Sequence, residues 1–276
     1  MSITQQCKQR PLSRIGVGLA ALGRPGYVNL GHASDLGAEY DPTAMEARTH
    51  AVLDAALESG VRYFDTARSY GRAEDFLASW LRLRRIAPAS VTIGSKWGYI
   101  YTAGWRVDAE RHEVKDHSLP VLRRQLGESR ERLGSHLALY QVHSATLESG
   151  VLDRADVLAE LGRLRDSGVR VGLTLSGAGQ AATLEHAIGV EVEGERLFQC
   201  VQATWNLLEP SCGDALSRAH RAGMGVIVKE GLANGRLTER NRDPAFGPRR
   251  RALEEVARRL GARLDALALA AILDQP

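Results

Sequence analysis

Three short apolar runs of the sequence each end in a side chain that can take part in acid–base chemistry, namely Asp65, Lys96 and His143. Tyr70 follows Asp65 by five residues, in the segment DTARSY. A Lys ammonium beside a Tyr lowers the pKa of the phenol and makes the Tyr a proton donor near neutral pH. Pairing that Lys with an Asp compensates both charges on burial. With a His to hydrogen-bond a substrate oxygen, the group suits protonation of a carbonyl oxygen while hydride arrives at the carbon.

Each of these residues also has an ordinary structural interpretation. An Asp at a strand end commonly caps a helix, a Tyr packs on the surface, a Lys lays its stem along apolar neighbours, and a His sits hydrogen-bonded in the core. These four structural interpretations are not independent of one another. Even so, it is less probable that all four residues have purely structural roles than that any one of them does. We therefore predict one site that contains Asp65, Tyr70, Lys96 and His143.

The elements that position this group alternate between short apolar strands and amphipathic helices. Serial βα units imply a parallel sheet buried on both faces, either closed as a (β/α)8 barrel or open and doubly wound. In both layouts the side chains at the carboxyl ends of the strands meet at one rim. Seven strands are predicted, at Ile15–Leu19, Val61–Asp65, Val91–Lys96, Leu137–His143, Val169–Ser176, Val201–Thr204 and Gly225–Lys229.

Helices are predicted between these strands and after the last one. The first has a T-x-x-E capping box at Thr43 and Glu46, and Gly60 stands where a C-terminal cap belongs. No linker or change of composition divides the chain, so residues 1–276 are expected to form a single domain. The other helices are predicted at Ala73–Leu83, Leu119–Leu133, Arg154–Ser167, Gln180–Ile188, Asp214–Ala222, Arg249–Leu260 and Leu264–Leu273.

Composition places the chain among ordinary globular proteins, with 44% hydrophobic and 25% charged residues. The net charge of +3 is too small to argue for nucleic acid or a membrane surface as a partner. No apolar run approaches the roughly 18 residues that span a bilayer, and the first residues lack the apolar core of a signal peptide. Three cysteines without a C-x-x-C pair favour a reducing compartment. We expect a cytoplasmic monomer or small homo-oligomer that acts on a small molecule.

Around the four residues the sequence resembles the aldo-keto reductases. Three motifs carry the likeness: FDTA through SYG around Asp65 and Tyr70, IGSK ending in Lys96, and LYQVH ending in His143. The likeness extends over nearly the whole chain, from GVGLAALG to ALALAAILDQP. It implies a (β/α)8 TIM barrel that binds a nicotinamide cofactor, usually NADPH. It also implies reduction of an aldehyde or ketone to an alcohol, or the reverse reaction.

The resemblance also implies roles for single residues. Tyr70 is the general acid and base, Lys96 and Asp65 tune its pKa, and His143 orients the carbonyl. The sequence departs from the family where Gly177 follows Ser176 in place of Asn, and where an aromatic residue commonly stacks on the nicotinamide. These departures bear on cofactor geometry and affinity more than on reaction type. The implied cofactor contacts are Ser176 and Gln202 at the carboxamide, and Leu232, Gly235 and Arg236 along the pyrophosphate. Lys229 stands at the position where the family commonly has the aromatic residue that stacks on the nicotinamide.

Aromatic residues gather in the predicted loop Trp97–Ser118, which holds four of the chain's fifteen aromatics. One interpretation is a loop that packs its own rings against the protein. The other is an aromatic wall over the substrate, which suits a partly apolar or aromatic substrate or a sugar stacked on rings. The predicted substrate contacts are Trp97, Tyr99, Trp105 and Trp205, and Tyr27, His32 and Tyr40 of the first loop are candidates to extend the wall.

Other functions fit parts of the sequence. The family resemblance includes cofactor-binding regulatory subunits, so an NADP(H)-binding subunit with little turnover is the main alternative to an enzyme. The segment Gly16-x-Gly18-x-x-Ala21 approximates a dinucleotide fingerprint, but a Gly- and Pro-rich loop follows instead of the required helix. The run His112–His117 is one residue too long for H-E-x-x-H, and no metal site is expected.

Seven strands and a final helix leave the predicted barrel one βα unit short. In the resembling family, that unit closes the barrel and carries the basic residues that grip the 2′-phosphate of NADP. An unclosed barrel leaves two unpaired strand edges. We therefore expect the natural chain to continue past Pro276, with an unrecognised strand as the alternative.

Overall fold

A computed structural model describes residues 14–26 and 39–275 of the chain. Seven strands form one parallel sheet in the order β1-β2-β3-β6-β7-β10-β11. A doubly wound sheet reverses its strand order, whereas a barrel does not, so this order selects the barrel layout of the two that the sequence left open. The strands are β1 (Gly16–Gly18), β2 (Tyr63–Asp65), β3 (Thr92–Trp97), β6 (Leu137–Ala145), β7 (Arg170–Leu175), β10 (Cys200–Thr204) and β11 (Gly225–Lys229).

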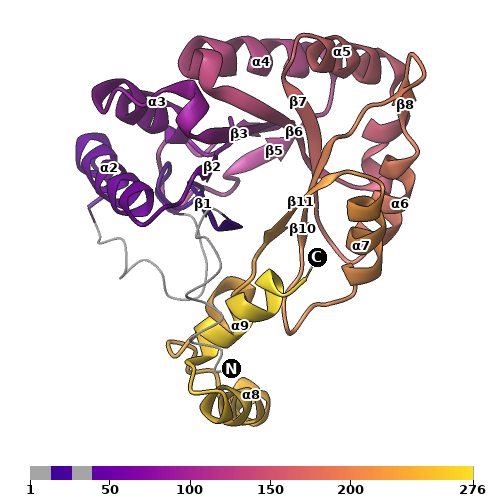
Figure 1. The fold of residues 1–276 in the computed structure, drawn as a ribbon. Helices are drawn as coiled ribbons and strands as arrows, with labels where there is room; N and C mark the ends of the chain where they lie inside the picture. Colours follow the sequence, from indigo (N-terminus) through magenta and orange to yellow (C-terminus); the bar gives the residue numbers. More distant parts are fainter. Residues whose placement is uncertain (1–13, 27–38, 276) are drawn as a thin grey trace.

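The sheet is curled but the barrel is not closed. Figure 1 shows helices in an arc around the outside of the curled sheet. All seven predicted strands are found, and within the described residues β1 and β11 pair with β2 and β10 only, which makes them the two edges of the sheet. The predicted barrel architecture is thus confirmed as a curled half-barrel that lacks a closing strand between β1 and β11.

The helices lie close to their predicted positions, except at the start of the first. The predicted capping box at Thr43 is wrong, because Asp41 caps this helix through hydrogen bonds from the backbone N–H groups of Thr43 and Ala44. Pro42 takes the first helical position, where its fixed φ suits the helix and its missing N–H is no loss. The helices are α2 (Pro42–Glu58), α3 (Ala73–Leu83), α4 (Leu119–Leu133), α5 (Ala155–Asp166), α6 (Gln180–Ile188), α7 (Gly213–Arg221), α8 (Gly247–Arg259) and α9 (Leu264–Leu273).

Two small antiparallel hairpins stand outside the main sheet. The predicted loop after β3 contains one of them, formed by β4 (Tyr99–Tyr101) and β5 (Glu113–Lys115). The other joins β8 (Glu191–Val192) to β9 (Glu195–Arg196). In the part of the chain that the structure describes, no helix is long and apolar enough to cross a membrane.

Tyr63 lies inside the curled sheet, opposite Gly16 in the strand register and next to Gly94, which pairs with Asp65. A Cβ atom built on Gly16 would lie 2.5 Å from the Tyr63 ring, and one on Gly94 would lie 2.5 Å from the Tyr63 hydroxyl. Both strands can therefore approach the ring only because these residues lack side chains. The Tyr63 hydroxyl points toward the carboxyl ends of the strands and donates a hydrogen bond to Asp65 Oδ1 at 2.9 Å.

The last two helices lie apart from the arc of helices α2–α7, beside the open side of the sheet (Figure 1). They form a second small core around Leu237, Phe246 and Leu264. On the other side of the opening, Arg14 Nη1 donates a hydrogen bond to the carbonyl oxygen of Leu273 in α9. Helix α9 therefore connects the region before β1 with the region after β11, where a closing strand would stand in a full barrel.

Candidate active site

The four predicted catalytic residues meet at the carboxyl ends of β2, β3 and β6. Lys96 Nζ donates a hydrogen bond to Asp65 Oδ2 and lies 4.8 Å from the centroid of the Tyr70 ring. The Tyr70 hydroxyl lies 3.5 Å from His143 Nε2. The structure thus brings Asp65, Tyr70, Lys96 and His143 into one cluster, as the strand ends predict.

Asp65 is the most heavily hydrogen-bonded group of the cluster. Besides Lys96 at Oδ2, its Oδ1 accepts from the Tyr63 hydroxyl, from Gln202 Nε2 at 3.1 Å and from Gln141 Nε2 at 3.4 Å. Burial, followed by the negative charge of Asp65, raises the pKa of Tyr63 well above its usual value, so this phenol stays a donor. These contacts compensate a nearly buried carboxylate and hold the Lys96 ammonium at a fixed place beneath Tyr70.

His143 is held as a neutral imidazole. Burial, and after it the positive charges of Lys96 and Arg24, lower the pKa of His143 well below its usual value. Its backbone carbonyl oxygen lies 2.9 Å from His117 Nε2, and the Tyr99 ring packs edge-on with centroids 4.9 Å apart. A neutral imidazole has one N–H, so His143 can donate one hydrogen bond to a substrate oxygen.

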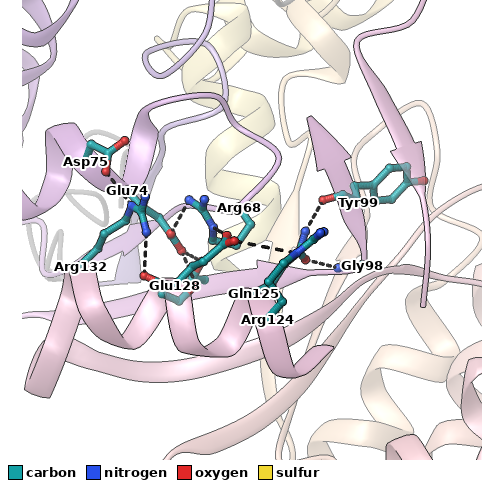
Figure 2. Close-up of polar contacts among 11 residues, drawn as sticks. Arg68, Glu74, Asp75, Gly98, Tyr99, Arg124, Gln125, Glu128 and Arg132 are labelled. Carbon is teal, nitrogen blue, oxygen red and sulfur yellow. Dashed lines mark hydrogen bonds and ion pairs between the residues drawn. The ribbon is translucent and has the colours of Figure 1, made fainter. Parts of the chain in front are cut away.

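The loop that carries Tyr70 is anchored by a buried ion pair, drawn in Figure 2. Arg68 Nη1 donates to Glu74 Oε2 at 2.8 Å, and Arg68 Nε donates to Glu128 Oε2 at 2.8 Å. The Glu74 side chain is fully buried, and its second oxygen accepts from Ser95 and Ser129 at 2.5 and 2.7 Å. Because Arg68 lies two residues before Tyr70, this network ties the Tyr70 loop to β3, α3 and α4.

A second polar anchor holds the segment after β3. Gln125 of α4 accepts from the backbone N–H of Gly98 and donates to the carbonyl oxygen of Tyr99, as Figure 2 also shows. This contact places Tyr99 against His143. Sequence reasoning missed both anchors, although a charged residue such as Glu74 within a run of apolar helix positions is a signal for a buried ion pair.

The cluster opens into a cleft of about 840 Å³ that runs between β1 and β11. Four of the predicted cofactor contacts, Ser176, Gln202, Lys229 and Leu232, line this cleft. Gly235 and Arg236 are not among the lining residues, and the exposed Arg236 donates from Nη1 to the carbonyl oxygen of Ala233 at 3.4 Å. Apolar side chains of α9 (Leu269, Ile272 and Leu273) line the side of the cleft where the sheet is open.

The loop after β11 has an unusual backbone. Glu230, Ala233, Asn234 and Gly235 all adopt positive φ, between 48° and 90°. Non-glycine residues rarely adopt such values. The backbone N–H groups of Ala233, Gly235, Arg236 and Leu237 donate to carbonyl oxygens within this segment, so hydrogen bonds of the loop itself hold this backbone. Leu232 and Asn234 line the cleft, which places the loop at its border.

The four predicted substrate aromatics do not form one wall. Trp97 is fully buried and packs against His117, because the strand pleat that points Lys96 into the barrel points its neighbour outward. Trp105 donates to the carbonyl oxygen of Tyr40 at 2.7 Å and packs on Phe76 of α3. Taken over the described residues, the lining of the cleft includes none of Trp97, Tyr99, Trp105 and Trp205.

Tyr99 alone of the four touches the catalytic cluster, through its edge-on contact with His143. Trp205 lies against Gly213 at the start of α7, where a Cβ atom would come within 3.0 Å of its indole nitrogen. Tyr27 and His32 lie outside the described residues. The cleft is instead lined beside Tyr70 by charged residues, among them Arg24 and Glu113, which the sequence did not single out.

Comparison with known proteins agrees with this geometry. A model of the aldo/keto reductase family matches residues 14–276. The chain belongs to this family. The predicted resemblance is thus confirmed over nearly the whole chain, and the curled parallel sheet is the family's barrel with its closing unit absent from residues 14–26 and 39–275.

Two curated relatives carry oxidoreductase names. The chain is 32% identical to a pyridoxal 4-dehydrogenase of Microbacterium luteolum over an alignment of 157 residues, and the match covers 49% of this chain and 43% of that protein. It is 27% identical to an uncharacterised oxidoreductase of Bacillus subtilis over 199 residues, 67% of this chain and 58% of that protein. The matched stretches thus span only about half the length of these relatives, and both names support the predicted enzyme class.

Solved structures of the family share the fold. An aldo-keto reductase of Bacillus halodurans in its holo form superposes with a TM-score of 0.68 at 18% identity, covering 92% of this chain and 76% of that one. A glycerol dehydrogenase of Gluconobacter oxydans also has a TM-score of 0.68, at 22% identity, covering 97% of this chain and 81% of that one. At this level of identity the likeness shows the fold alone.

Proposed function

We propose that the protein is a nicotinamide-dependent oxidoreductase that reduces an aldehyde or ketone to an alcohol, or catalyses the reverse reaction, with NADPH as the preferred cofactor. The observation that carries the proposal is the position of Tyr70. Its ring lies 4.8 Å from the Lys96 ammonium, and its hydroxyl lies 3.5 Å from His143 Nε2. A phenol between a buried cation and a neutral imidazole is placed to exchange a proton with a carbonyl or alcohol oxygen.

In the proposed reaction each residue has one task. In the reductive direction the Tyr70 hydroxyl gives its proton to the substrate oxygen, and in the oxidative direction the phenolate takes it back. Lys96 stabilises the phenolate that remains, and Asp65 holds Lys96 in place. His143 donates one N–H to the same substrate oxygen and so orients the carbonyl. A bound nicotinamide supplies or accepts the hydride.

The cleft fits such a cofactor. It has room for a bulky ligand, three of the four catalytic residues (Asp65, Tyr70 and His143) line it, and the loop after β11 borders it. Ser176 and Gln202 would hold the carboxamide, and the stretch Leu232–Arg236 would lie along the pyrophosphate. Lys229 Nζ bonds to Thr204 and Glu230 in this structure, so its ammonium is fixed at the rim where a nicotinamide ring would lie. The preference for NADPH rests on the family resemblance.

The part of the cleft beside Tyr70 carries polar and charged side chains, which favour a polar substrate. Arg24, Glu113 and Ser144 surround the opening beside Tyr70 and His143, whereas the aromatic residues that would favour an apolar substrate lie elsewhere. The curated relative that is named for a substrate is a pyridoxal dehydrogenase, and pyridoxal is a hydroxylated aldehyde. We propose a hydroxylated aldehyde, ketone or alcohol as substrate. The described cysteines, Cys200 and Cys212, are both free thiols, which supports the proposed cytoplasmic location.

The test is a cofactor titration followed by a substrate panel. NADPH and NADH are first titrated into the protein by fluorescence, and NADPH oxidation is then followed with hydroxylated, aliphatic and aromatic carbonyls. The proposal expects tighter binding of NADPH and turnover with at least one hydroxylated carbonyl. Tight NADPH binding without turnover of any carbonyl or alcohol would instead support the regulatory-subunit alternative.

A further inference from the structure

Arg24 stands at the catalytic cluster although no motif of the sequence marks it. It follows β1, its side chain is only 7% exposed, and it lines the cleft. Its guanidinium carbon lies 5.5 Å from the centroid of the Tyr70 ring. Its Nη1 donates to the carbonyl oxygen of Ser69 at 3.0 Å and to Glu113 Oε2 of β5 at 2.9 Å.

The backbone around Arg24 packs closely against the loop that carries Tyr70. A Cβ atom on Gly23 would lie 2.4 Å from the carbonyl oxygen of Tyr70, and one on Gly71, at φ +60°, would lie 2.8 Å from Arg24 Cβ. The backbone N–H of Arg72 donates to the carbonyl oxygen of Gly23 at 2.7 Å. Only glycine permits this approach of the two loops, so the position of Arg24 beside Tyr70 is built into the backbone.

The charges that face Tyr70 come from every element around it. Lys96 is paired with Asp65, and Arg24 is paired with Glu113. His143 is neutral, and Lys229 pairs with Glu230 farther along the cleft. Tyr70 therefore lies beside two cations, and among the residues that the structure describes Glu113 pairs with Arg24 and Asp65 pairs with Lys96. The groups concerned are Asp65 of β2, Lys96 of β3, Glu113 of β5, His143 of β6, Lys229 and Glu230 at the end of β11, and Arg24 after β1.

We propose that Arg24 is a second cation, beside Lys96, that stabilises the phenolate of Tyr70, and that Glu113 sets how strongly it does so. The inference rests on the proposed function in that it makes Tyr70 the proton donor. A positive charge near a phenol favours the ionised form. A counter-ion weakens that effect, so loss of Arg24 and loss of Glu113 must act in opposite directions.

The size of the effect follows from the distance. The 5.5 Å between the guanidinium carbon and the ring centroid sets only the scale of the separation between the two charges. Unit charges about 5–8 Å apart, at the effective dielectric constant of about 20 found near protein surfaces, shift a proton equilibrium by about one to two pH units. Glu113 offsets part of this charge, so about one pH unit is expected from loss of Arg24 and less from loss of Glu113. Expressed as an equilibrium, one pH unit is a tenfold change in the ionisation of Tyr70.

The experiment titrates Tyr70 directly and does not depend on turnover. Tyrosinate absorbance at alkaline pH is recorded for the wild-type protein and for Arg24→Gln, Arg24→Lys and Glu113→Gln, and the titration of Tyr70→Phe in each background is subtracted. Burial raises the pKa of Tyr63 and of Tyr140 well above the usual value, which keeps these phenols out of the same range. Arg106→Gln is the matched control, because Arg106 is exposed on the same hairpin segment and pairs with Asp108 outside the cleft.

The expected result is a Tyr70 pKa raised by about one pH unit in Arg24→Gln, close to the wild-type value in Arg24→Lys and Arg106→Gln, and lowered in Glu113→Gln. An unchanged pKa in Arg24→Gln, or shifts of the same sign in Arg24→Gln and Glu113→Gln, would overturn the inference. If Arg24→Gln does not fold, the Glu113→Gln variant tests the inference by itself. Only a lowered pKa of Tyr70 in that variant agrees with the inference. Absence of turnover in the wild-type protein would refute the proposed function and leave this titration to decide the role of Arg24.

Discussion

Replacing Glu74 by alanine should destabilise the protein far more than removing its sequence neighbour Asp75. Glu74 is fully buried and bonds Arg68, Ser95 and Ser129, whereas Asp75 is half-exposed and, within the described residues, pairs with Arg132 at 2.6 Å (Figure 2). Both are acidic residues in the first turn of α3, so the comparison holds charge and helix position constant. Only the burial of the carboxylate and its partners differs.

The magnitude follows from what each substitution leaves behind. Loss of Glu74 leaves the Arg68 guanidinium with Glu128 alone and removes the acceptor of two buried hydroxyls, which together cost about 3–5 kcal/mol. Loss of Asp75 breaks an exposed pair, which costs about 0–1 kcal/mol. Glu74→Gln keeps an acceptor for the two serines but replaces the acceptor of the Arg68 bond by an amide donor, at a cost of about 1.5–3 kcal/mol.

Urea unfolding followed by circular dichroism measures these free energies. A double-mutant cycle with Arg68→Met should show strong coupling, because the double variant no longer buries an unpaired charge. Below the unfolding transition, Glu74→Gln should also lower kcat about tenfold or more, since Arg68 positions the Tyr70 loop. Equal free energies for Glu74→Ala and Asp75→Ala, or additive effects in the cycle, would refute the reasoning.

Four further predictions follow from the site and the core. Tyr70→Phe should lose most turnover while NADPH binding, measured by fluorescence, stays within a few-fold of wild type, and full activity would exclude Tyr70 as the acid. Because Trp97 is fully buried and does not line the cleft, Trp97→Ala should lose about 3–5 kcal/mol of stability in urea unfolding, and an unchanged free energy of unfolding would contradict its place in the core. Burial lowers the pKa of His117 to about 4 from the usual 6.5, so its unfolded state binds the extra proton first and stability falls as the pH drops from about 6.5 toward 4. His117→Gln should flatten that part of the stability profile, and an unchanged slope would contradict the assignment. Burial raises the pKa of Cys200 to about 12 and of Cys212 to about 11, so thiol reagents at pH 8 should label both only in urea, as peptide mass spectrometry would show.

Much of the fold follows from the sequence because its signals are local. Runs of β-branched and apolar residues predict each strand of the main sheet, and strict alternation with helices predicts that the sheet is parallel. The ends of those strands then place Asp65, Lys96 and His143 at one rim, because parallel strands share a direction. One local prediction, the start of α2, was wrong because two neighbouring residues could both cap the helix. Asp41, which precedes Pro42, is the N-cap in place of Thr43.

The surroundings of the site depend on contacts between residues far apart in the chain. Arg24 meets Glu113 across 89 residues, and Gln202 meets Asp65 across 137, and no pattern within a window of the sequence records either pair. The sheet pleat decides that Trp97 faces the helices while Lys96 faces the site. The sequence by itself thus determined the order of the elements and the four residues that could do the chemistry. Only the tertiary structure decided which charges surround Tyr70, because electrostatic interactions depend on distance and burial in space and not on separation along the chain.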